Sequence, residues 1–226
     1  MALLLAGIPY NVPGETINRL CASGMSSIIH AHRAIKANDG DLFISGGVEN
    51  MTRGPLVISK ASTAYGRDSK MFDSSFGWRF INPLLDKLYG TDSMGTTAEN
   101  LVSKYNISRE DQDKFAYNSQ MKASLSQKNG VFEQEIVKVV IPQRKKENII
   151  FDKDEFIKPN TSVEILSKLR AAFKKDGSVT AGNSSGLNDG AAAMLLSSDE
   201  GLKKFNLKPK AKIISSAVVG VEPKIM

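Results

Sequence analysis

The chain has 226 residues, of which 41% are hydrophobic and 24% charged, and its formal net charge is +6. This length and balance indicate a globular protein of one large or two small domains, and they exclude a disordered or membrane-embedded chain. No apolar run approaches the ~20 residues that span a bilayer, and the apolar opening lacks the basic segment of a secretory signal. We therefore expect no membrane partner.

The chain contains one cysteine, Cys21, and two histidines, His30 and His32. A single cysteine allows no internal disulfide, which is typical of a reducing compartment, so we expect a cytoplasmic protein. One thiol and two imidazoles are a poor ligand set for zinc, so no metal site is expected. Basic residues gather at 144–146 and 203–212. A solvated face is the first interpretation of this charge and a phosphate-bearing small molecule the second. Nucleic acid is disfavoured, because no recognised motif accompanies the charge.

The N-terminal part predicts a strand, a helix and a second strand. Residues 1–7 resemble the last turns of a helix that ends at a glycine. Residues 16–20 predict an extended segment, and the pattern over 23–38 predicts a helix with almost no polar face, which we expect to be mostly buried. The apolar run 42–44, bounded by glycines, predicts a buried parallel strand. Residues 16–46 would then form the crossover unit of an α/β fold.

The middle of the chain is less regular. Residues 52–93 show little periodicity, which indicates a long excursion over the surface. Helical patterning resumes near Met94, and Ser108-Arg-Glu-Asp111 is a capping box that starts a helix running to Lys128. Further elements are predicted as a helix at 162–173 and strands at 135–141, 191–196 and 212–219.

The spacing of Cys21 from the histidines excludes a local catalytic pair. His30 lies nine residues on, roughly 13 Å along a helix and about half a turn around it, and His32 is farther away. Both histidines are typical of packing or surface positions. Cys21 itself lies where a strand meets a helix, and free N–H groups and the helix dipole there favour a thiolate. This position fits a nucleophile elbow, and a buried, inert cysteine is the alternative that position alone leaves open.

Five motifs resemble those of the thiolase family, whose members cleave or condense 3-oxoacyl-CoA thioesters. N-R-L-C-A-S-G-M at 18–25 resembles the nucleophile motif of the family. S-G-G-V-E-N-M-T at 45–52 and T-A-G-N-S-S-G-L-N-D-G-A-A-A at 180–193 resemble the second and third signatures. M-G-T-T-A-E-N at 94–100 and S-R-E-D-Q-D at 108–113 also match. The resemblance covers essentially the whole chain, with the motifs in family order and at family-like spacing.

The resemblance implies the α/β fold of the N-terminal half of a thiolase: a mixed five-stranded sheet with helices and a long loop excursion. Residues 1–208 would form the N-terminal domain, with the excursion at 52–180, and 209–226 would begin a second domain. The resemblance also implies truncation at both ends, including loss of the first strand-helix-strand. We therefore expect the isolated chain to be marginally stable or to need a complementing C-terminal half, and the full-length family implies a homo-oligomer.

The resemblance also assigns site residues. Cys21 matches the thiolase cysteine that takes an acyl group from acyl-CoA and passes it to CoA or to a second thioester. Met94 matches a position beside the pantetheine, and Ala181 and Ser185 match positions that line the pantetheine arm. Lys158 aligns with an arginine that some members place against the CoA nucleotide, and lysine keeps the charge but loses planar stacking. For Met94 and Lys158 a structural role remains the alternative. CoA thioesters are the expected substrates, and no separate cofactor is implied.

Two departures from the family pattern bear on function. Ser93 stands where many acetoacetyl-specific members have histidine, and F-G-W-R-F-I-N-P-L at 76–84 resembles members acting on 3-oxoadipyl-CoA. These features favour that substrate class or a general 3-oxoacyl-CoA. Thiolases also need the histidine of N-x-x-G-G-x-x-x-x-G-H-P, the second cysteine of C-x-G-G-G and the asparagine of N-E-A-F, and none of these motifs occurs here. Two functions stay open: an acyl-CoA C-acyltransferase, or a non-catalytic fragment that binds CoA or partner chains.

Overall fold

The structure is a computed structural model that describes residues 1–75 and 77–226, so Phe76, the first residue of the segment 76–84, lies outside the described residues. Two compact units make up the chain. Unit 1 comprises residues 1–54 and 188–220, and unit 2 comprises 55–187 and 221–226. Both units mix helices and strands, which confirms the predicted α/β class.

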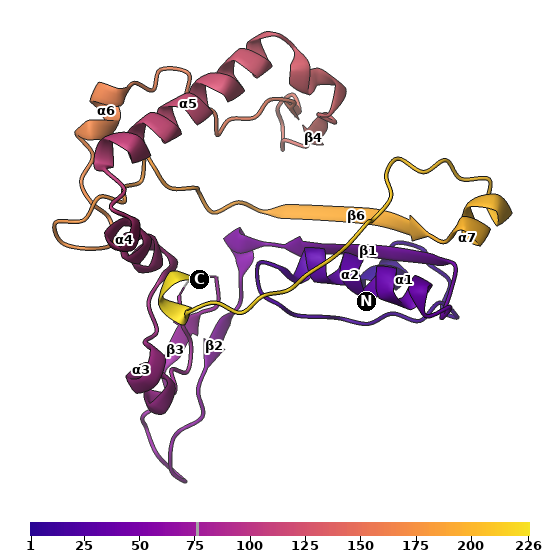
Figure 1. Ribbon diagram of the computed structural model, residues 1–226, viewed down its shortest axis with the longest axis horizontal. Helices are drawn as coiled ribbons and strands as arrows, with labels where there is room; N and C mark the ends of the chain where they lie inside the picture. Colours follow the sequence, from indigo (N-terminus) through magenta and orange to yellow (C-terminus); the bar gives the residue numbers. More distant parts are fainter. Residues whose placement is uncertain (76) are drawn as a thin grey trace. The chain divides into compact units, whose positions relative to one another are not determined.

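Unit 1 is built around one pair of long strands (Figure 1). Its elements are α1 (Ala2–Leu5), α2 (Ser23–Lys36), β1 (Leu42–Glu49), η1 (Met51–Arg53), β6 (Gly190–Ser197) and α7 (Asp199–Lys204). β1 and β6 run antiparallel, in a register that pairs the first residue of each strand with the last of the other. A Cβ at Gly46 would lie 2.5 Å from the carbonyl oxygen of Ala192, so only glycine allows this approach of the strands. α2 packs on the sheet, and Ser45 Oγ donates to the carbonyl of Ser27 at 3.1 Å.

Two predictions for this unit are wrong. The helix predicted at 23–38 is present as α2, but only Ser26, Ile29 and Ala31 are buried, and Met25 is 69% exposed. A two-stranded sheet is narrow and covers only one side of the helix. The parallel crossover over 16–46 is also not formed. β1 pairs with antiparallel β6, and residues 16–20 belong to no described strand.

Unit 2 contains two long helices, at 94–105 and 109–128, and the sequence predicted where each of them begins. Its elements are β2 (Leu56–Ile58), β3 (Met71–Asp73), α3 (Pro83–Tyr89), α4 (Met94–Tyr105), α5 (Arg109–Lys128), η2 (Val131–Gln134), β4 (Val139–Ile141), β5 (Ile149–Phe151), α6 (Val163–Ser167) and η3 (Pro223–Ile225). The Ser108 hydroxyl accepts the N–H of Asp111 at 3.0 Å, which confirms the predicted cap of α5. Gly130 follows α5 at φ +70°, a left-handed conformation that favours glycine.

Other predicted elements of unit 2 are shorter in the structure. The helix expected over 162–173 is only α6. Arg109 Nη2 donates to the carbonyls of Leu166, in α6, and Leu169, beyond it, at 2.7 and 3.0 Å. The strand expected over 135–141 is reduced to β4, which pairs with β5. The irregular stretch 52–93 contains the β2–β3 hairpin and α3, which its weak periodicity did not predict.

The predicted five-stranded sheet is also wrong for the described residues. They contain three separate two-stranded sheets, β1–β6, β2–β3 and β4–β5. Residues 212–219, predicted as a strand, have no regular structure. A strand is stable only when its backbone groups pair with a neighbour, and neither 16–20 nor 212–219 meets one in the described part of the chain. The predicted domain boundaries at 52–180 and 208 remain predictions.

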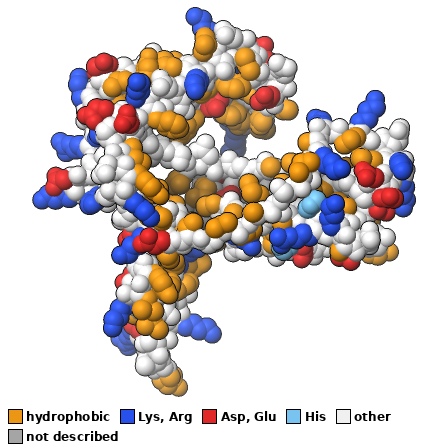
Figure 2. All heavy atoms as spheres, in the orientation of Figure 1, with side chains coloured by type: hydrophobic (Ala, Val, Ile, Leu, Met, Phe, Trp, Pro, Cys, Tyr) orange, Lys and Arg blue, Asp and Glu red, His pale blue; other side chains and the backbone are white. Residues whose placement is uncertain are grey.

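Much apolar surface is exposed (Figure 2). The accessible area is 18754 Å², compared with roughly 10,000 Å² for a compact monomer of this mass. Ile44 and Leu195, paired in the β1–β6 sheet, are 56% and 50% exposed, and Val140 in β4 is 53% exposed. None of the helices within residues 1–75 and 77–226 is long and apolar enough to cross a membrane.

Candidate active site

Cys21 lies in a tight turn that its own motif builds. Leu20, just before it, has φ +48°, a left-handed conformation that is uncommon outside glycine. The carbonyl of Leu20 accepts the N–H of Ser23 at 3.0 Å and its hydroxyl at 2.7 Å. Ser23 Oγ in turn accepts the N–H of Arg19 at 2.8 Å, and Asn18 Oδ1 accepts the N–H of Leu20 at 2.8 Å. These bonds hold the turn, and the Cys21 side chain is exposed.

The turn delivers Cys21 to the N-terminus of α2. Ala22 is the N-cap residue and provides no side-chain cap, and the first turn contains no acidic residue. Within the described residues, the N–H groups of Gly24 and Met25 find no acceptor. Unbonded N–H groups and the positive end of the helix dipole favour a nearby anion. The arrangement suits a cysteine thiolate or an oxyanion that develops beside it.

The two histidines lie elsewhere on α2. His30 is exposed, and its Nδ1 lies 3.6 Å from Glu15 Oε1. His32 is half-buried. These are the surface and packing positions that the sequence predicted, and no hydrogen bond described in the structure joins either imidazole to Cys21. Across residues 1–75 and 77–226, no three His, Cys, Asp or Glu side chains gather as a metal site would require.

The second and third motifs meet at the end of the β1–β6 pair. The Thr52 N–H donates to Asp189 Oδ1 at 2.9 Å, and the Thr52 hydroxyl donates to Asp189 Oδ2 at 2.7 Å. The backbone bond and then the hydroxyl bond from Thr52 hold the pKa of Asp189 below its ordinary value of 3.8. The sequence pattern did not predict this bridge, although Thr52 and Asp189 lie in the second and third family motifs. The register that pairs Glu49 with Gly190 brings them together.

The first part of the third motif lies in unit 2 and forms a closed turn. Asn183 Oδ1 accepts the N–H of Thr180 at 2.7 Å. Thr180 is fully buried, and its Oγ1 accepts the N–H groups of Gly182 and Asn183 at 3.2 and 3.3 Å. Ala181 lies in this turn and Ser185 two residues beyond it, and both are exposed. The two predicted pantetheine contacts therefore share one ordered loop.

Two buried carboxylates support this loop. Glu99 on α4 accepts the N–H groups of Ser178 and Val179, both at 2.8 Å. Asp113 on α5 accepts Arg109 Nε at 2.7 Å and Asn183 Nδ2 at 3.0 Å. The sequence pattern predicted neither of these contacts. The available signal was an acidic residue inside each of the motifs 94–100 and 108–113.

The remaining predicted residues also lie in unit 2. Met94 is the first residue of α4 and is 64% exposed. Lys158 is exposed, and its backbone N–H donates to Gln120 Oε1 on α5 at 2.8 Å, while its Nζ donates to the carbonyl of Glu155 at 3.3 Å. The four predicted CoA contacts therefore belong to unit 2, whereas Cys21 belongs to unit 1. The roles of all five residues remain predictions.

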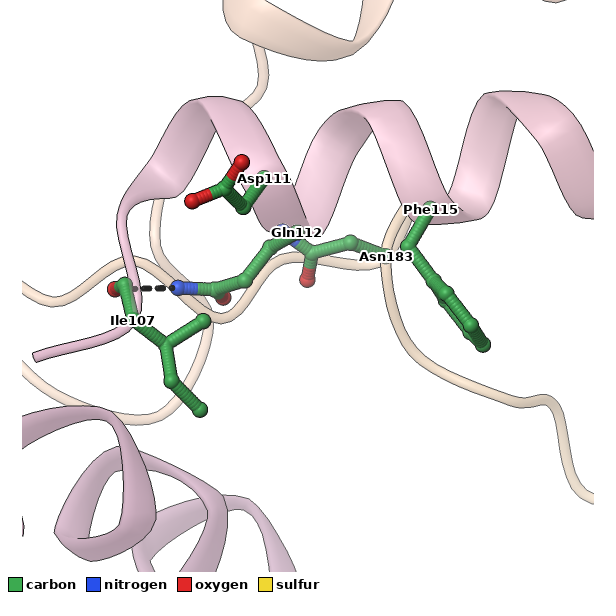
Figure 3. A pocket seen from close by; sticks show the side chains of 5 residues that line it. All are labelled: Ile107, Asp111, Gln112, Phe115 and Asn183. Atoms are coloured by element: carbon green, nitrogen blue, oxygen red, sulfur yellow. Dashed lines mark hydrogen bonds between the residues drawn. The ribbon is translucent and has the colours of Figure 1, made fainter. Parts of the chain in front are cut away.

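An open hollow of about 380 Å³ lies beside the loop (Figure 3). Ile107, Asp111, Gln112, Phe115 and Asn183 line it, and Gln112 Nε2 donates to the carbonyl of Ile107 at 3.3 Å. Phe115 is 78% exposed. The hollow contains none of the predicted site residues, so it provides no independent support for them.

Comparison with known proteins supports the resemblance over the whole chain. Residues 1–200 match the model of the thiolase N-terminal domain. The chain is 52% identical to a beta-ketoadipyl-CoA thiolase of Acinetobacter baylyi and 49% identical to a 3-oxoadipyl-CoA/3-oxo-5,6-dehydrosuberyl-CoA thiolase of Escherichia coli, over 226 residues in each case. These matches cover 100% of this chain and 56% of each relative. The chain therefore spans about half the length of the curated relatives that it matches.

Solved structures agree with the sequence matches. The chain superimposes on the acetyl-CoA acetyltransferase of Bacillus anthracis with a TM-score of 0.83 at 39% identity, covering 99% of this chain and 55% of that one. Human mitochondrial 3-ketoacyl-CoA thiolase gives a TM-score of 0.75 at 37% identity, covering 91% and 51%. The expected thiolase-like fold is thus confirmed. The chain belongs to the thiolase family, and its match lies in the N-terminal domain of that family.

Proposed function

We propose that this chain supplies the nucleophile-bearing half of an acyl-CoA C-acyltransferase, with Cys21 as the nucleophile. One observation carries the proposal: an exposed cysteine sits at the uncapped N-terminus of α2, inside the residues that match the thiolase N-terminal domain. The free N–H groups of the first helical turn support it, because such donors suit the oxyanion that develops when the sulfur attacks a carbonyl carbon.

The proposed chemistry is transfer of an acyl group through a thioester on Cys21. In the cleavage direction, the Cys21 sulfur attacks the 3-oxo carbon of a 3-oxoacyl-CoA, an S–C bond forms, and the C2–C3 bond breaks. The electron pair of that bond stays on C2, which takes up a proton and leaves as acetyl-CoA. The CoA thiol then attacks the acyl group on Cys21, a new acyl-CoA leaves, and the Cys21 sulfur takes back the proton. In the reverse direction, Cys21 takes the acyl group of an acyl-CoA, CoA leaves as a thiol, and C2 of a second acyl-CoA, after losing a proton, accepts the acyl group. Each step needs an acid or base near the sulfur.

The proposed substrates are 3-oxoacyl-CoA thioesters, with 3-oxoadipyl-CoA as the first candidate. The names of the Acinetobacter and Escherichia relatives support this choice, as does the sequence of the segment 76–84. Met94, Lys158, Ala181 and Ser185 are proposed to contact CoA. Their exposure leaves them free to do so.

The acid and base of this chemistry are proposed to come from a second half. The chain has one cysteine, and neither histidine is followed by proline, so the G-H-P and C-x-G-G-G motifs are not in these 226 residues. A homo-oligomer of the assembled protein and a cytoplasmic location stay predictions. The alternative function is that of a non-catalytic fragment that binds CoA or partner chains.

A complementation assay separates the two functions. The chain is mixed with a separately produced C-terminal half of the Acinetobacter relative, and cleavage of 3-oxoadipyl-CoA by CoA is followed by chromatography, with acetoacetyl-CoA as the comparison substrate. We expect cleavage with both halves present, none with either half alone, and none with Cys21→Ser. Cleavage that survives Cys21→Ser would refute the role of Cys21. No cleavage by the mixture, with CoA still bound by the chain, would favour the alternative.

A further inference from the structure

Unit 2 buries two carboxylates that the proposed chemistry does not use. Glu99 is 3% exposed and Asp113 is 1% exposed. Charged side chains are rarely buried this deeply unless they are paired or fully hydrogen-bonded. The hydrogen bonds of each carboxylate offset the cost of its burial, and the groups that donate them indicate what each carboxylate holds in place.

Glu99 binds the chain immediately before the loop that carries Ala181. Its Oε1 accepts two successive N–H groups, those of Ser178 and Val179, both at 2.8 Å. The Glu99 carboxylate lies so close to the backbone at Gly177 that a Cβ on this residue would collide with it. Two successive backbone N–H groups that bind one carboxylate oxygen have their directions fixed by it.

Asp113 fixes the other side of the same loop through Asn183. Asn183 Nδ2 donates to Asp113 Oδ1 at 3.0 Å and to the carbonyl of Ser178 at 3.1 Å. A carboxylate only accepts hydrogen bonds, so the Asn183 side-chain amide must point its NH₂ group, and not its oxygen, toward Asp113. The Asn183 oxygen then faces the N–H of Thr180, at 2.7 Å, and closes the turn that holds Ala181.

We propose that Glu99 and Asp113 are positioning residues that hold the loop 178–185 in the shape that receives the pantetheine arm of CoA. The inference rests on the proposed function, because it takes Ala181 and Ser185 as CoA contacts. Glu99 also lies on α4, the helix that begins at Met94, so one carboxylate links that helix to the loop. A loop ordered before binding loses less conformational entropy when the ligand binds.

The test is titration of CoA into the 226-residue chain by calorimetry, with the folded fraction checked by circular dichroism at the same temperature. Glu99→Gln and Asp113→Asn keep the shapes of the side chains but remove the charges. Glu110→Gln is the matched control, since Glu110 is an exposed acidic residue of the first turn of α5. We expect Kd for CoA to rise about tenfold in the first two variants, equivalent to about 1.4 kcal/mol, and to stay unchanged in the control.

The outcomes separate this inference from the proposed function. Failure of the unsubstituted chain to bind CoA, both alone and mixed with the C-terminal half of the Acinetobacter relative, overturns the CoA site, and the positioning role falls with it. Unchanged Kd in folded Glu99→Gln and Asp113→Asn overturns the positioning role alone. If those variants unfold, Ser178→Ala decides. It removes the hydroxyl that donates to Glu99 Oε2 at 3.5 Å and accepts Gln112 Nε2 at 2.9 Å, and a rise in Kd of about threefold supports the inference while no rise overturns it.

Discussion

Replacing Asp113 with alanine should lower the free energy of unfolding by about 2–4 kcal/mol. The side chain is 2% exposed and accepts Arg109 Nε at 2.7 Å and Asn183 Nδ2 at 3.0 Å. Asn183 keeps its bond to the Ser178 carbonyl, so it loses only one of two acceptors. Arg109 Nη2 keeps its bonds to the carbonyls of Leu166 and Leu169, but Arg109 Nε loses its carboxylate partner while the side chain is only 24% exposed.

This loss is a large share of the free energy of unfolding of a small domain, which is about 5–15 kcal/mol. Urea unfolding followed by circular dichroism measures it as a shift of the midpoint at constant slope. Glu110→Ala is the control, because it removes an exposed carboxylate from the same helix turn. A loss for Asp113→Ala that is no greater than that of the control would refute the network as a source of stability.

Three further substitutions test local features. Ser108→Ala removes the hydroxyl that caps the first turn of α5 and should lower the unfolding free energy by about 1 kcal/mol, measured by urea unfolding. Asp189→Asn should destabilise the chain above pH 3.8, and its difference from wild type should shrink as the pH falls from 3.8 toward the lower folded pKa, because bonds from Thr52 hold the pKa of Asp189 down. Urea midpoints at pH 6 and at acid pH check this, and a pH-independent difference would contradict it. His30→Ala should leave the acylation of Cys21 unchanged, measured by mass spectrometry, because the imidazole faces Glu15.

Short-range signals in the sequence predicted local structure well. The capping box at Ser108 gave the start of α5 within one residue, and the alanine-rich run at 191–196 lies within β6. These features depend on residues a few positions apart. The turn at Cys21 also depends on near neighbours, since the bonds that hold it join residues 18–23.

Features that depend on distant partners could not be read from the sequence. The extended segments 16–20 and 212–219 have strand composition but meet no partner strand in the described chain. The partners of Glu99 lie 79 and 80 residues away, and Asn183 lies 70 residues from Asp113. The helical pattern of the sequence alone predicts that such carboxylates are exposed to solvent. Their burial follows only from the packing of α4 and α5 against the loop 178–185.

The acylation state of Cys21 tests the central claim most directly. The chain, with and without the C-terminal half of the Acinetobacter relative, is incubated with acetyl-CoA, quenched in acid and examined by intact and peptide mass spectrometry. We expect one acetyl group, located on Cys21 and missing from Cys21→Ser, with faster formation when the second half is present. An unmodified Cys21 in the complemented protein, or an equal adduct in Cys21→Ser, would contradict it.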